Sequence, residues 1–412
     1  MSLFGIMAVL LTLSAAFSYL NYRFFELPTT IGIMLFALMF SLALILLGHF
    51  GFPMAVWAKQ LLARVDFNRT LLHGMLSFLL FAGSLHVNVN DLARQKWIVG
   101  LLAIGGVVVS TVIVGLMAWW LLAMLGFHVP LIYGLLFGAL ISPTDPVAVL
   151  GIVRAAGASA VLKTRISGES LFNDGVGLVL FVILLQIAAG GDQPTVTRVA
   201  ELFLHEALGG VLFGLVIGWA AYLLLKSVDD YHVEVLITLA LVAGGYRLAD
   251  YLGFSGPIAI VVAGLLIGNH GRTLAMSERT RQHLDSFWEL IDEILNAVLF
   301  VLIGLEVLQI TVTGYFIAAG ALMIPVVLLA RLVSVGIPIV LTEAPCRSTL
   351  QVINVLTWGG LRGGIAVALA LSLPAGHERD LIITMTYAVV VFSIVVQGLT
   401  IGPLIARSSA ID

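Results

Sequence analysis

The sequence predicts an all-α protein with many membrane-spanning helices. Hydrophobic residues make up 60% of the 412-residue chain and charged residues only 10%, against about 25% charged residues in ordinary soluble domains. The mean hydropathy of +1.11 agrees with a protein whose main solvent is lipid. Since a hydrocarbon core about 30 Å thick requires roughly 20 apolar residues per helix, the chain has room for about 13 spans but for no sizeable soluble domain. Most classes of soluble enzyme are therefore excluded.

Composition also limits the partners. The net charge of −3 gives no basic excess, so nucleic acid is not expected to bind. The lone Cys346 rules out an intramolecular disulfide and a cysteine-based zinc site. No positive charge and no convincing cleavage site accompany the first apolar segment, so we expect residues 3–20 to be a first span and not a removable signal peptide.

Apolar runs between charged or Pro/Gly-rich breaks predict thirteen spans. They are 3–20, 28–48, 70–87, 97–125, 129–153, 168–190, 202–225, 233–252, 256–269, 288–308, 313–341, 350–373 and 381–405. The run 97–125 contains no ionisable residue, whereas 256–269 is short enough to be re-entrant.

Positive charges in the connections predict the orientation, because loops rich in Lys and Arg tend to stay in the cytoplasm. One set of alternate loops holds twelve such residues and the opposite set five. We therefore expect a multi-pass protein of the cell (inner) membrane with its N-terminus outside and its C-terminus in the cytoplasm. Lys59, Arg64 and Arg69 run against this assignment locally.

The fifth span is interrupted by prolines. Pro143 and Pro146 remove two backbone donors and disfavour helix at the residues that precede them. The upstream half should end near Leu140 and direct free carbonyls at the gap. Asp145 followed by Pro146 is a good start for a second half-helix that runs from Val147 towards Val153.

The twelfth span is interrupted by glycines. Four glycines surround Arg362 in the segment 358–364, and glycine at this density favours unwinding. Spans five and twelve would cross the membrane in opposite directions, as in the inverted repeats of secondary transporters, here spans 1–6 and 8–13. Charge at both breaks, from Asp145 and Arg362, favours a functional site over ordinary kinks.

The sixth span opens with a polar arc. At about 100° per residue, Glu169, Ser170, Asn173 and Asp174 fall on one side of the helix, and Gly177 leaves space beside them. These oxygen-bearing groups suit a hard cation, and the same carboxylates can accept protons. Cation and proton would then compete for one site, with Asp174 the deepest carboxylate.

Arg362 needs a buried anion. Glu169 and Asp145 are both candidates, and we expect a fixed pair with Glu169, while Asp145 and the adjacent helix ends offset each other's partial charges. Arg331 in the eleventh span either lines a cytoplasmic funnel or reaches a lipid headgroup.

Four segments together closely resemble the monovalent cation/proton antiporters of the NhaP type. They are Ser142-Pro143-Thr144-Asp145-Pro146-Val147-Ala148-Val149, Gly168-Glu169-Ser170-Leu171-Phe172-Asn173-Asp174-Gly175, Phe287-Trp288-Glu289 through Leu305-Glu306, and Gly360-Leu361-Arg362-Gly363-Gly364. Their order and spacing are specific, and the resemblance covers nearly the whole chain. Relatives with a long cytoplasmic tail differ from this chain, which leaves regulation open.

The resemblance implies an NhaA/NhaP-like fold and a homodimer within the lipid bilayer. It implies a mobile six-helix bundle from about 97–190 and 313–405, with scaffold helices from about 1–90 and 200–308. It also implies that Asp174, Glu169 and Ser170 bind the cation together with the Thr144 main chain. In this reading Asn173 steadies the Glu169–Arg362 pair, and no cofactor is required.

The expected function is exchange of Na⁺ or Li⁺ for H⁺ by alternating access. Asn173 stands where a second exchangeable carboxylate could have been, so we expect electroneutral one-for-one exchange. A K⁺/H⁺ antiporter is the main alternative. A cation channel and an intramembrane aspartyl protease are remote ones, and Gly175-Val176-Gly177-Leu178 lacks the aspartate of the protease motif.

Other polar residues are open to two interpretations. Arg247 and Asp250, one turn apart, should pair locally. His73 could sense pH or pack as a hydrogen-bonded histidine. Acidic and amide side chains around the tenth span could steer cations or lie at the membrane interface; these are Asp292, Glu293, Asn296 and Glu306.

Overall fold

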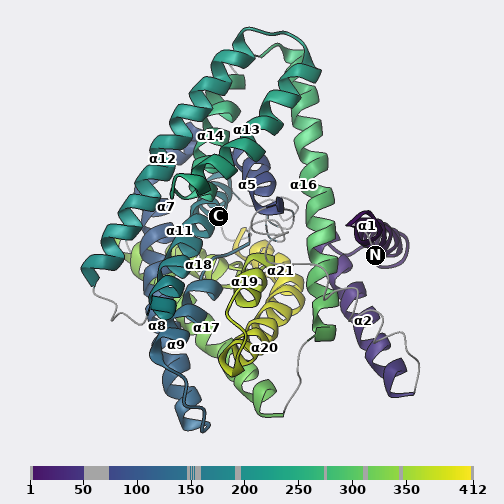
Figure 1. Ribbon diagram of the computed structural model, residues 1–412, viewed down its shortest axis with the longest axis vertical. Helices are drawn as coiled ribbons and strands as arrows, with labels where there is room; N and C mark the ends of the chain where they lie inside the picture. The colour runs from purple at the N-terminus through teal and green to yellow at the C-terminus, as the bar shows by residue number, and fades with distance from the viewer. Residues whose placement is uncertain are drawn as a thin grey trace.

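The computed structural model describes residues 3–50, 74–145, 149, 151, 153, 159–190, 196–272, 276–309, 314–342 and 347–409, and these residues form helices and no strand (Figure 1). In chain order the elements are α1 (Leu3–Leu20), η1 (Asn21–Phe25), α2 (Thr29–His49), α5 (Leu76–Leu85), α6 (Val89–Arg94), α7 (Lys96–Gly100), η3 (Leu101–Gly105), α8 (Gly106–Met124), α9 (Leu131–Ile141), α11 (Ala160–Gly190), α12 (Val196–Lys226), α13 (Tyr231–Tyr251), α14 (Gly256–Leu266), η4 (Ile267–Gly271), α16 (Glu278–Glu306), η5 (Val307–Gln309), α17 (Gly314–Thr342), α18 (Arg347–Trp358), α19 (Gly364–Leu371), α20 (His377–Phe392), η6 (Ser393–Gln397) and α21 (Gly398–Ser409).

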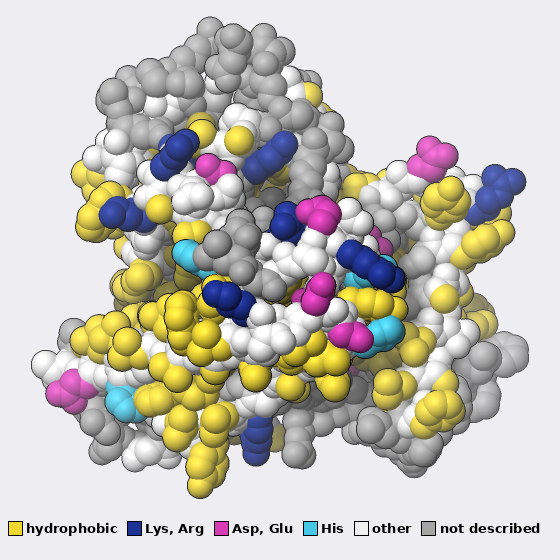
Figure 2. All heavy atoms as spheres, turned by 90° about the horizontal axis from the view of Figure 1, so that it is seen from above, with side chains coloured by type: hydrophobic (Ala, Val, Ile, Leu, Met, Phe, Trp, Pro, Cys, Tyr) yellow, Lys and Arg dark blue, Asp and Glu magenta, His cyan; other side chains and the backbone are white. Residues whose placement is uncertain are grey.

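The predicted all-α membrane fold is confirmed. Within the described residues, eight helices are long and apolar enough to cross a membrane, and three shorter apolar helices accompany them. The total of thirteen spans stays a prediction. Large apolar side chains such as Trp120, Leu212 and Val216 face outward, and seen from above many surface side chains are hydrophobic (Figure 2). Lipid is the environment that accommodates such a surface.

Several predicted spans were too short. Helix α16 begins at Glu278, where 288 was expected, and α12 begins at Val196, where 202 was expected. The first helical stretch continues through the π-helical turn η1 to Phe25, where 3–20 was expected. Helix α11 begins at Ala160, eight residues before the expected start at Gly168. No proline separates the two positions, and Arg165 is anchored there by Nη2 donating to the Gln95 side chain at 3.1 Å. Charged residues therefore extend this helix beyond its apolar part and do not end it.

The helices pack into two groups that α11 joins. Helix α8 packs against α9 and α17, and α17 packs against α20. In the other group α14 packs against α12 and α5, and α16 packs against α2. Figure 1 shows α12, α13 and α14 toward the top and α8, α9, α17 and α20 toward the bottom. Because α11 touches α9 in one group and α12 and α14 in the other, its side chains lie where the groups meet.

Both interrupted helices are confirmed. Helix α9 ends at Ile141, and Ser142 to Asp145 are not helical; Val149, Gly151 and Val153 are helical again. The other residues of the half-helix predicted from Val147 lie outside the described residues. Helix α18 ends at Trp358, Gly359 to Gly363 are unwound, and α19 begins at Gly364.

Candidate functional site at the crossing of two interrupted helices

The two unwound segments bond directly to each other. The Asp145 backbone N–H donates to the Leu361 carbonyl at 2.8 Å. A Cβ on Gly363 would overlap the Asp145 carboxylate, so glycine is required for this close approach. Backbone groups released by unwinding must be satisfied within the protein at membrane depth. The place where the two unwound segments meet is called the crossing below. Its hydrogen bond between Asp145 and Leu361 meets part of that requirement.

The last spanning helix secures the glycine break. The Arg362 backbone N–H donates to Ser393 Oγ at 3.0 Å, and Gln397 Nε2 donates to the Trp358 carbonyl at 2.9 Å. Both supporting side chains lie on the π-helical turn η6 and are buried. Side chains of η6 thus replace hydrogen bonds that an unbroken helix would have made within itself.

The Arg362 side chain binds the end of α9. Its Nη1 donates to the carbonyls of Ser142 at 2.7 Å and Pro143 at 2.9 Å, and the side chain is only 2% exposed. A cation is favourable at a helix C-terminus, where free carbonyls concentrate negative partial charge. The predicted direct pair between Glu169 and Arg362 is therefore wrong, because Arg362 donates its side-chain hydrogen bonds to carbonyls and interacts with Glu169 electrostatically.

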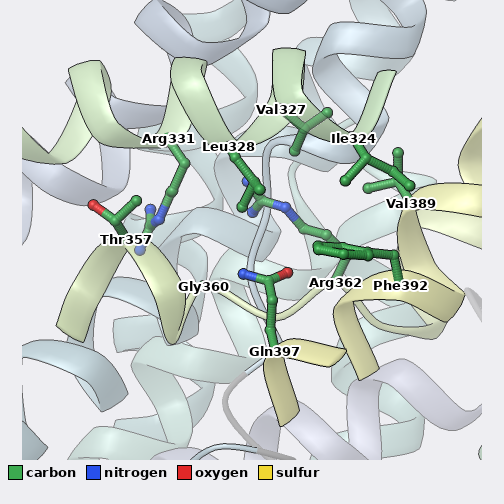
Figure 3. Close-up of a pocket in the computed structure, with 10 residues that line it drawn as sticks. All are labelled: Ile324, Val327, Leu328, Arg331, Thr357, Gly360, Arg362, Val389, Phe392 and Gln397. Atoms are coloured by element: carbon green, nitrogen blue, oxygen red, sulfur yellow. The ribbon is translucent and has the colours of Figure 1, made fainter. Parts of the chain in front are cut away.

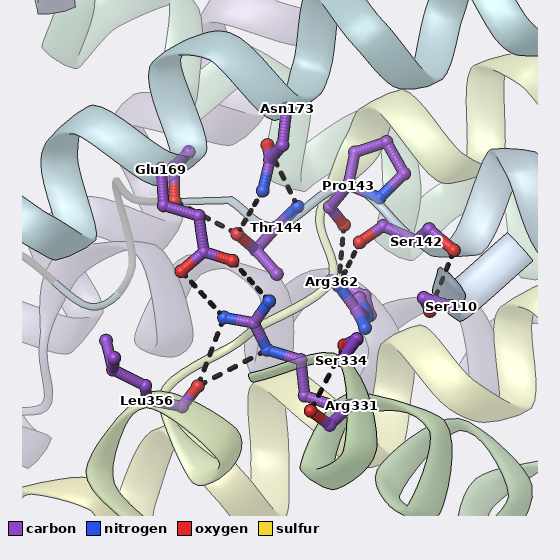
Figure 4. A network of polar contacts seen from close by, with 11 residues as sticks. Ser110, Ser142, Pro143, Thr144, Glu169, Asn173, Arg331, Ser334, Leu356 and Arg362 are labelled. Carbon is purple, nitrogen blue, oxygen red and sulfur yellow. Dashed lines mark hydrogen bonds and ion pairs between the residues drawn. The ribbon is translucent and has the colours of Figure 1, made fainter. Parts of the chain in front are cut away.

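Glu169 is paired with Arg331 instead (Figure 4). Arg331 Nη2 donates to Glu169 Oε2 at 2.9 Å, and Nη1 donates to Oε1, which makes the pair bidentate. Arg331 also donates from Nε and Nη2 to the Leu356 carbonyl near the end of α18. Both charged side chains are buried. Neither role expected for Arg331, funnel lining or headgroup contact, is what the structure shows.

Asn173 binds the proline break and not the ion pair. Its Nδ2 donates to Thr144 Oγ1 at 2.8 Å, and its Oδ1 accepts from the Thr144 backbone N–H at 3.4 Å. Thr144 Oγ1 also lies 3.0 Å from Ser170 Oγ. The role that the resemblance implied for Asn173, steadying the Glu169–Arg362 pair, is therefore corrected. Its amide satisfies a backbone donor that the break leaves free.

Gly177 provides the space that was expected beside the polar arc. A Cβ at this position would overlap the Pro143 ring, so the ring of the proline break occupies that space. On its other side the break is held by Ser142 Oγ, which donates to the Gly138 carbonyl at 2.6 Å and lies 2.9 Å from Ser110 Oγ on α8. These contacts hold the unwound segment against the polar side of α11.

Asp174 lies beside this network. Its side chain is only 6% exposed, yet among the described residues it has no hydrogen bond or ion pair, and it interacts electrostatically with Asp145. A buried carboxylate without a protein partner is costly when ionised. It is therefore well suited to hold a cation or a proton.

The oxygen donors near the crossing are mixed in type. Among the described residues, no group of three or more His, Cys, Asp and Glu side chains could hold a metal ion. The expected cation ligands instead combine carboxylates with hydroxyl groups, and Thr144 and Ser170 do lie together. Such a set carries less charge than the oxygen cages of divalent cations.

A small pocket separates the two buried arginines (Figure 3). It measures about 10 Å³, room for about one water molecule, and its lining includes Arg331, Gly360, Arg362 and Gln397. The Nε of Arg362 is buried without a hydrogen-bond partner among the described residues. The two guanidinium groups thus line one pocket but have different partners, a carboxylate for Arg331 and backbone carbonyls for Arg362.

Two predicted features lie away from the crossing or outside the description. Arg247 Nη1 contacts Asp250 Oδ2 at 2.9 Å, which confirms the local pair. His73 and Cys346 lie outside the described residues.

Comparisons with known proteins give one consistent family. The family model described as "Sodium/hydrogen exchanger, transmembrane" matches residues 9–407. The Na⁺/H⁺ antiporter NhaP of Pseudomonas aeruginosa is 51% identical over 98% of this chain and 96% of that protein. The Na⁺/H⁺ antiporter NhaH of Halobacillus dabanensis is 36% identical over 89% of this chain and 91% of that protein.

A solved structure agrees on the fold. The sodium proton antiporter MjNhaP1 of Methanocaldococcus jannaschii superposes with a TM-score of 0.77 at 19% identity, covering 98% of this chain and 97% of that one. The chain has the same pair of interrupted helices that its sequence predicts, and the family model extends over almost all of it. The chain belongs to the sodium/hydrogen exchanger family.

Proposed function

We propose that this protein exchanges Na⁺ for H⁺ across the membrane, with both ions competing for Asp174. The observation that carries the proposal is the buried Asp174 carboxylate, which lies beside the helix crossing without a hydrogen-bond partner among the described residues. The relatives' names favour Na⁺ over the K⁺/H⁺ alternative, and Li⁺ stays an expected second substrate. Membership of an exchanger family also argues against a channel or a protease.

The proposed cation ligands surround the start of the polar arc. Asp174 supplies the exchangeable carboxylate, while Ser170 and Thr144 supply neutral oxygens and lie 3.0 Å apart through their hydroxyls. Glu169 remains among the proposed cation ligands. Each of its carboxylate oxygens accepts one hydrogen bond from Arg331 and can accept another contact. Asp145 adds negative potential close to Asp174.

The contacts favour a one-for-one exchange. Arg331 occupies both oxygens of Glu169 in a bidentate pair, and Asn173 is hydrogen-bonded to Thr144. Asp174 is then the group of the polar arc whose bound ion changes during the cycle, from one monovalent cation to one proton. Each cycle should move no net charge.

The remaining architecture is proposed from the sequence. Helices α8, α9, α11, α17, α19 and α20 pack around the breaks, in keeping with a moving bundle from about 97–190 and 313–405 beside scaffold helices from about 1–90 and 200–308. A homodimer in the inner membrane, with the N-terminus outside and the C-terminus cytoplasmic, completes the proposal. The charge distribution in the loops supports this orientation.

The decisive experiment uses the full chain in proteoliposomes that contain a pH-sensitive dye. Na⁺-driven proton flux should be present in the parent protein and absent in Asp174→Asn, which keeps hydrogen bonding but loses the exchangeable charge. Asp250→Asn is the matched control, because it removes a carboxylate that pairs at the surface with Arg247. Retained flux in Asp174→Asn would disprove the proposed role. A flux that changes with membrane potential set by K⁺ and valinomycin would disprove one-for-one exchange.

A further inference from the structure

One face of α16 lies against the helix crossing. Asp292, Asn296 and Leu299 follow one another at spacings of four and three residues, which places them on one side of the helix. A Cβ on Gly364 would contact the Leu299 side chain, and the neighbouring Gly363 packs against the Asp145 carboxylate. The polar pair Asp292 and Asn296 therefore lies on the helix face that meets the second break.

Asp292 differs from the other acidic residues on the same stretch of α16. It is half-buried, accepts a hydrogen bond from Asn296 Nδ2 at 3.1 Å, and interacts electrostatically with Asp145. Asn296 itself is only 3% exposed. Glu289 and Glu293 are exposed. The structure thus separates one acidic residue directed at the crossing from two at the surface.

Asp145 relates this carboxylate to the proposed cation site. Asp145, which acts electrostatically on Asp292, also acts on Asp174. Asp174 is buried and has no hydrogen bond or ion pair to any described residue. Asp145 is therefore within electrostatic reach of both the half-buried Asp292 and the buried Asp174. Adjacent negative charges at decreasing exposure lower the energy of a cation that is losing its hydration water.

We propose that Asp292, oriented by Asn296, is an entry position for the monovalent cation, which Asp292 holds before it reaches Asp174. The inference rests on the proposed function and adds a residue from outside the predicted cation site. An entry position raises the cation concentration at Asp174 without taking part in the exchange of cation for proton. Removing its charge should therefore raise the apparent KM for Na⁺ and leave the maximal rate nearly unchanged.

The test measures initial Na⁺-driven proton flux against Na⁺ concentration in proteoliposomes. Asp292→Asn keeps the shape of the side chain and should raise the KM by roughly tenfold, as expected for losing one nearby charge in a partly screened site. Its maximal rate should stay within about twofold of the parent protein. Asp292→Glu should keep a KM close to that of the parent. Glu293→Gln is the matched control and should change neither quantity.

A double variant that swaps the two side chains distinguishes the loss of charge from a structural effect of the substitution. The double variant Asp292→Asn/Asn296→Asp moves the carboxylate by one helical turn on the same face and should recover most of the lost affinity. An unchanged KM in Asp292→Asn, or a lower maximal rate at unchanged KM, would overturn the entry position. So would a double variant no better than Asp292→Asn. If the parent protein shows no Na⁺-driven flux, or Asp174→Asn retains it, the proposed function fails instead.

Discussion

The two breaks solve the same backbone problem with different residues. The proline break after α9 keeps side chains with oxygen atoms, and Thr144 contributes its hydroxyl to a contact with Ser170. The glycine break before α19 has glycine at three of its five unwound positions, and its backbone is held by Ser393 and Gln397. Unwinding alone therefore does not make a binding site. One break supplies ligand chemistry, whereas the other supplies room and support.

The two buried arginines show the same division. Arg331 neutralises the carboxylate of Glu169 on the polar arc. Arg362 instead donates its side-chain hydrogen bonds to the carbonyl end of α9. Each charge-assisted hydrogen bond is stronger than a neutral one, yet the two arginines should respond differently to loss of their partners.

The largest expected effect is on the Glu169–Arg331 pair. Arg331→Ala leaves a buried carboxylate unpaired and should lower the stability by about 3–5 kcal/mol. Glu169→Ala should cost a similar amount, and the double variant clearly less than the sum. Melting temperatures in detergent give the measurement. Strictly additive losses, or a stronger coupling of Glu169 to Arg362, would contradict the pairing.

The next effect concerns the close approach at the crossing. Gly363→Ala places a methyl group where the Asp145 carboxylate lies, and overpacking of this kind costs about 1–3 kcal/mol. The variant should lose stability and Na⁺ affinity together, because Asp145 must shift. Gly336→Ala on α17 is a suitable control, since nothing lies within 4 Å of the added Cβ. Equal behaviour of the two variants would show that the breaks do not need this contact.

The pH dependence of transport should test whether Na⁺ and protons compete for Asp174 beside the proline break. If protons and Na⁺ compete for Asp174, the apparent KM for Na⁺ should rise as the pH falls, by at most about tenfold for each pH unit. The maximal flux should follow a bell-shaped profile because scarce protons slow the return step. Initial rates at several pH values on both sides of the membrane provide the test. A KM that does not vary with pH would exclude competition at one site.

The smallest expected effects compare the hydrogen bonds that hold the glycine break with those that hold the proline break. Ser393→Ala leaves the buried Arg362 N–H without its acceptor and should cost about 1–3 kcal/mol. Ser110→Ala should cost only about 1 kcal/mol, because Ser142 keeps its bond to the Gly138 carbonyl. Both variants should leave the KM for Na⁺ unchanged. A larger loss in Ser110→Ala would mean that the proline break depends more on its neighbours than the glycine break does.

Some features were determined by the sequence alone. Pro143 and the glycines around Arg362 predict both interruptions, because a missing N–H and a missing side chain act on the residue's own backbone. Helical periodicity likewise predicts that Glu169, Ser170, Asn173 and Asp174 share one side of α11, since that relation depends on one helix only.

Tertiary structure decided the partners. From the sequence we expected Arg362 as the partner of Glu169. In the folded protein Arg331 on α17 binds that carboxylate, whereas Arg362 binds the end of α9. The selection of Asp292 over Glu293 also depends on which face of α16 meets the crossing. Sequence patterns within one helix cannot predict which charged residues will pair. The pairing depends on the depth, rotation and tilt of each helix relative to its neighbours. Those quantities are set when the helices pack, and not by any one segment.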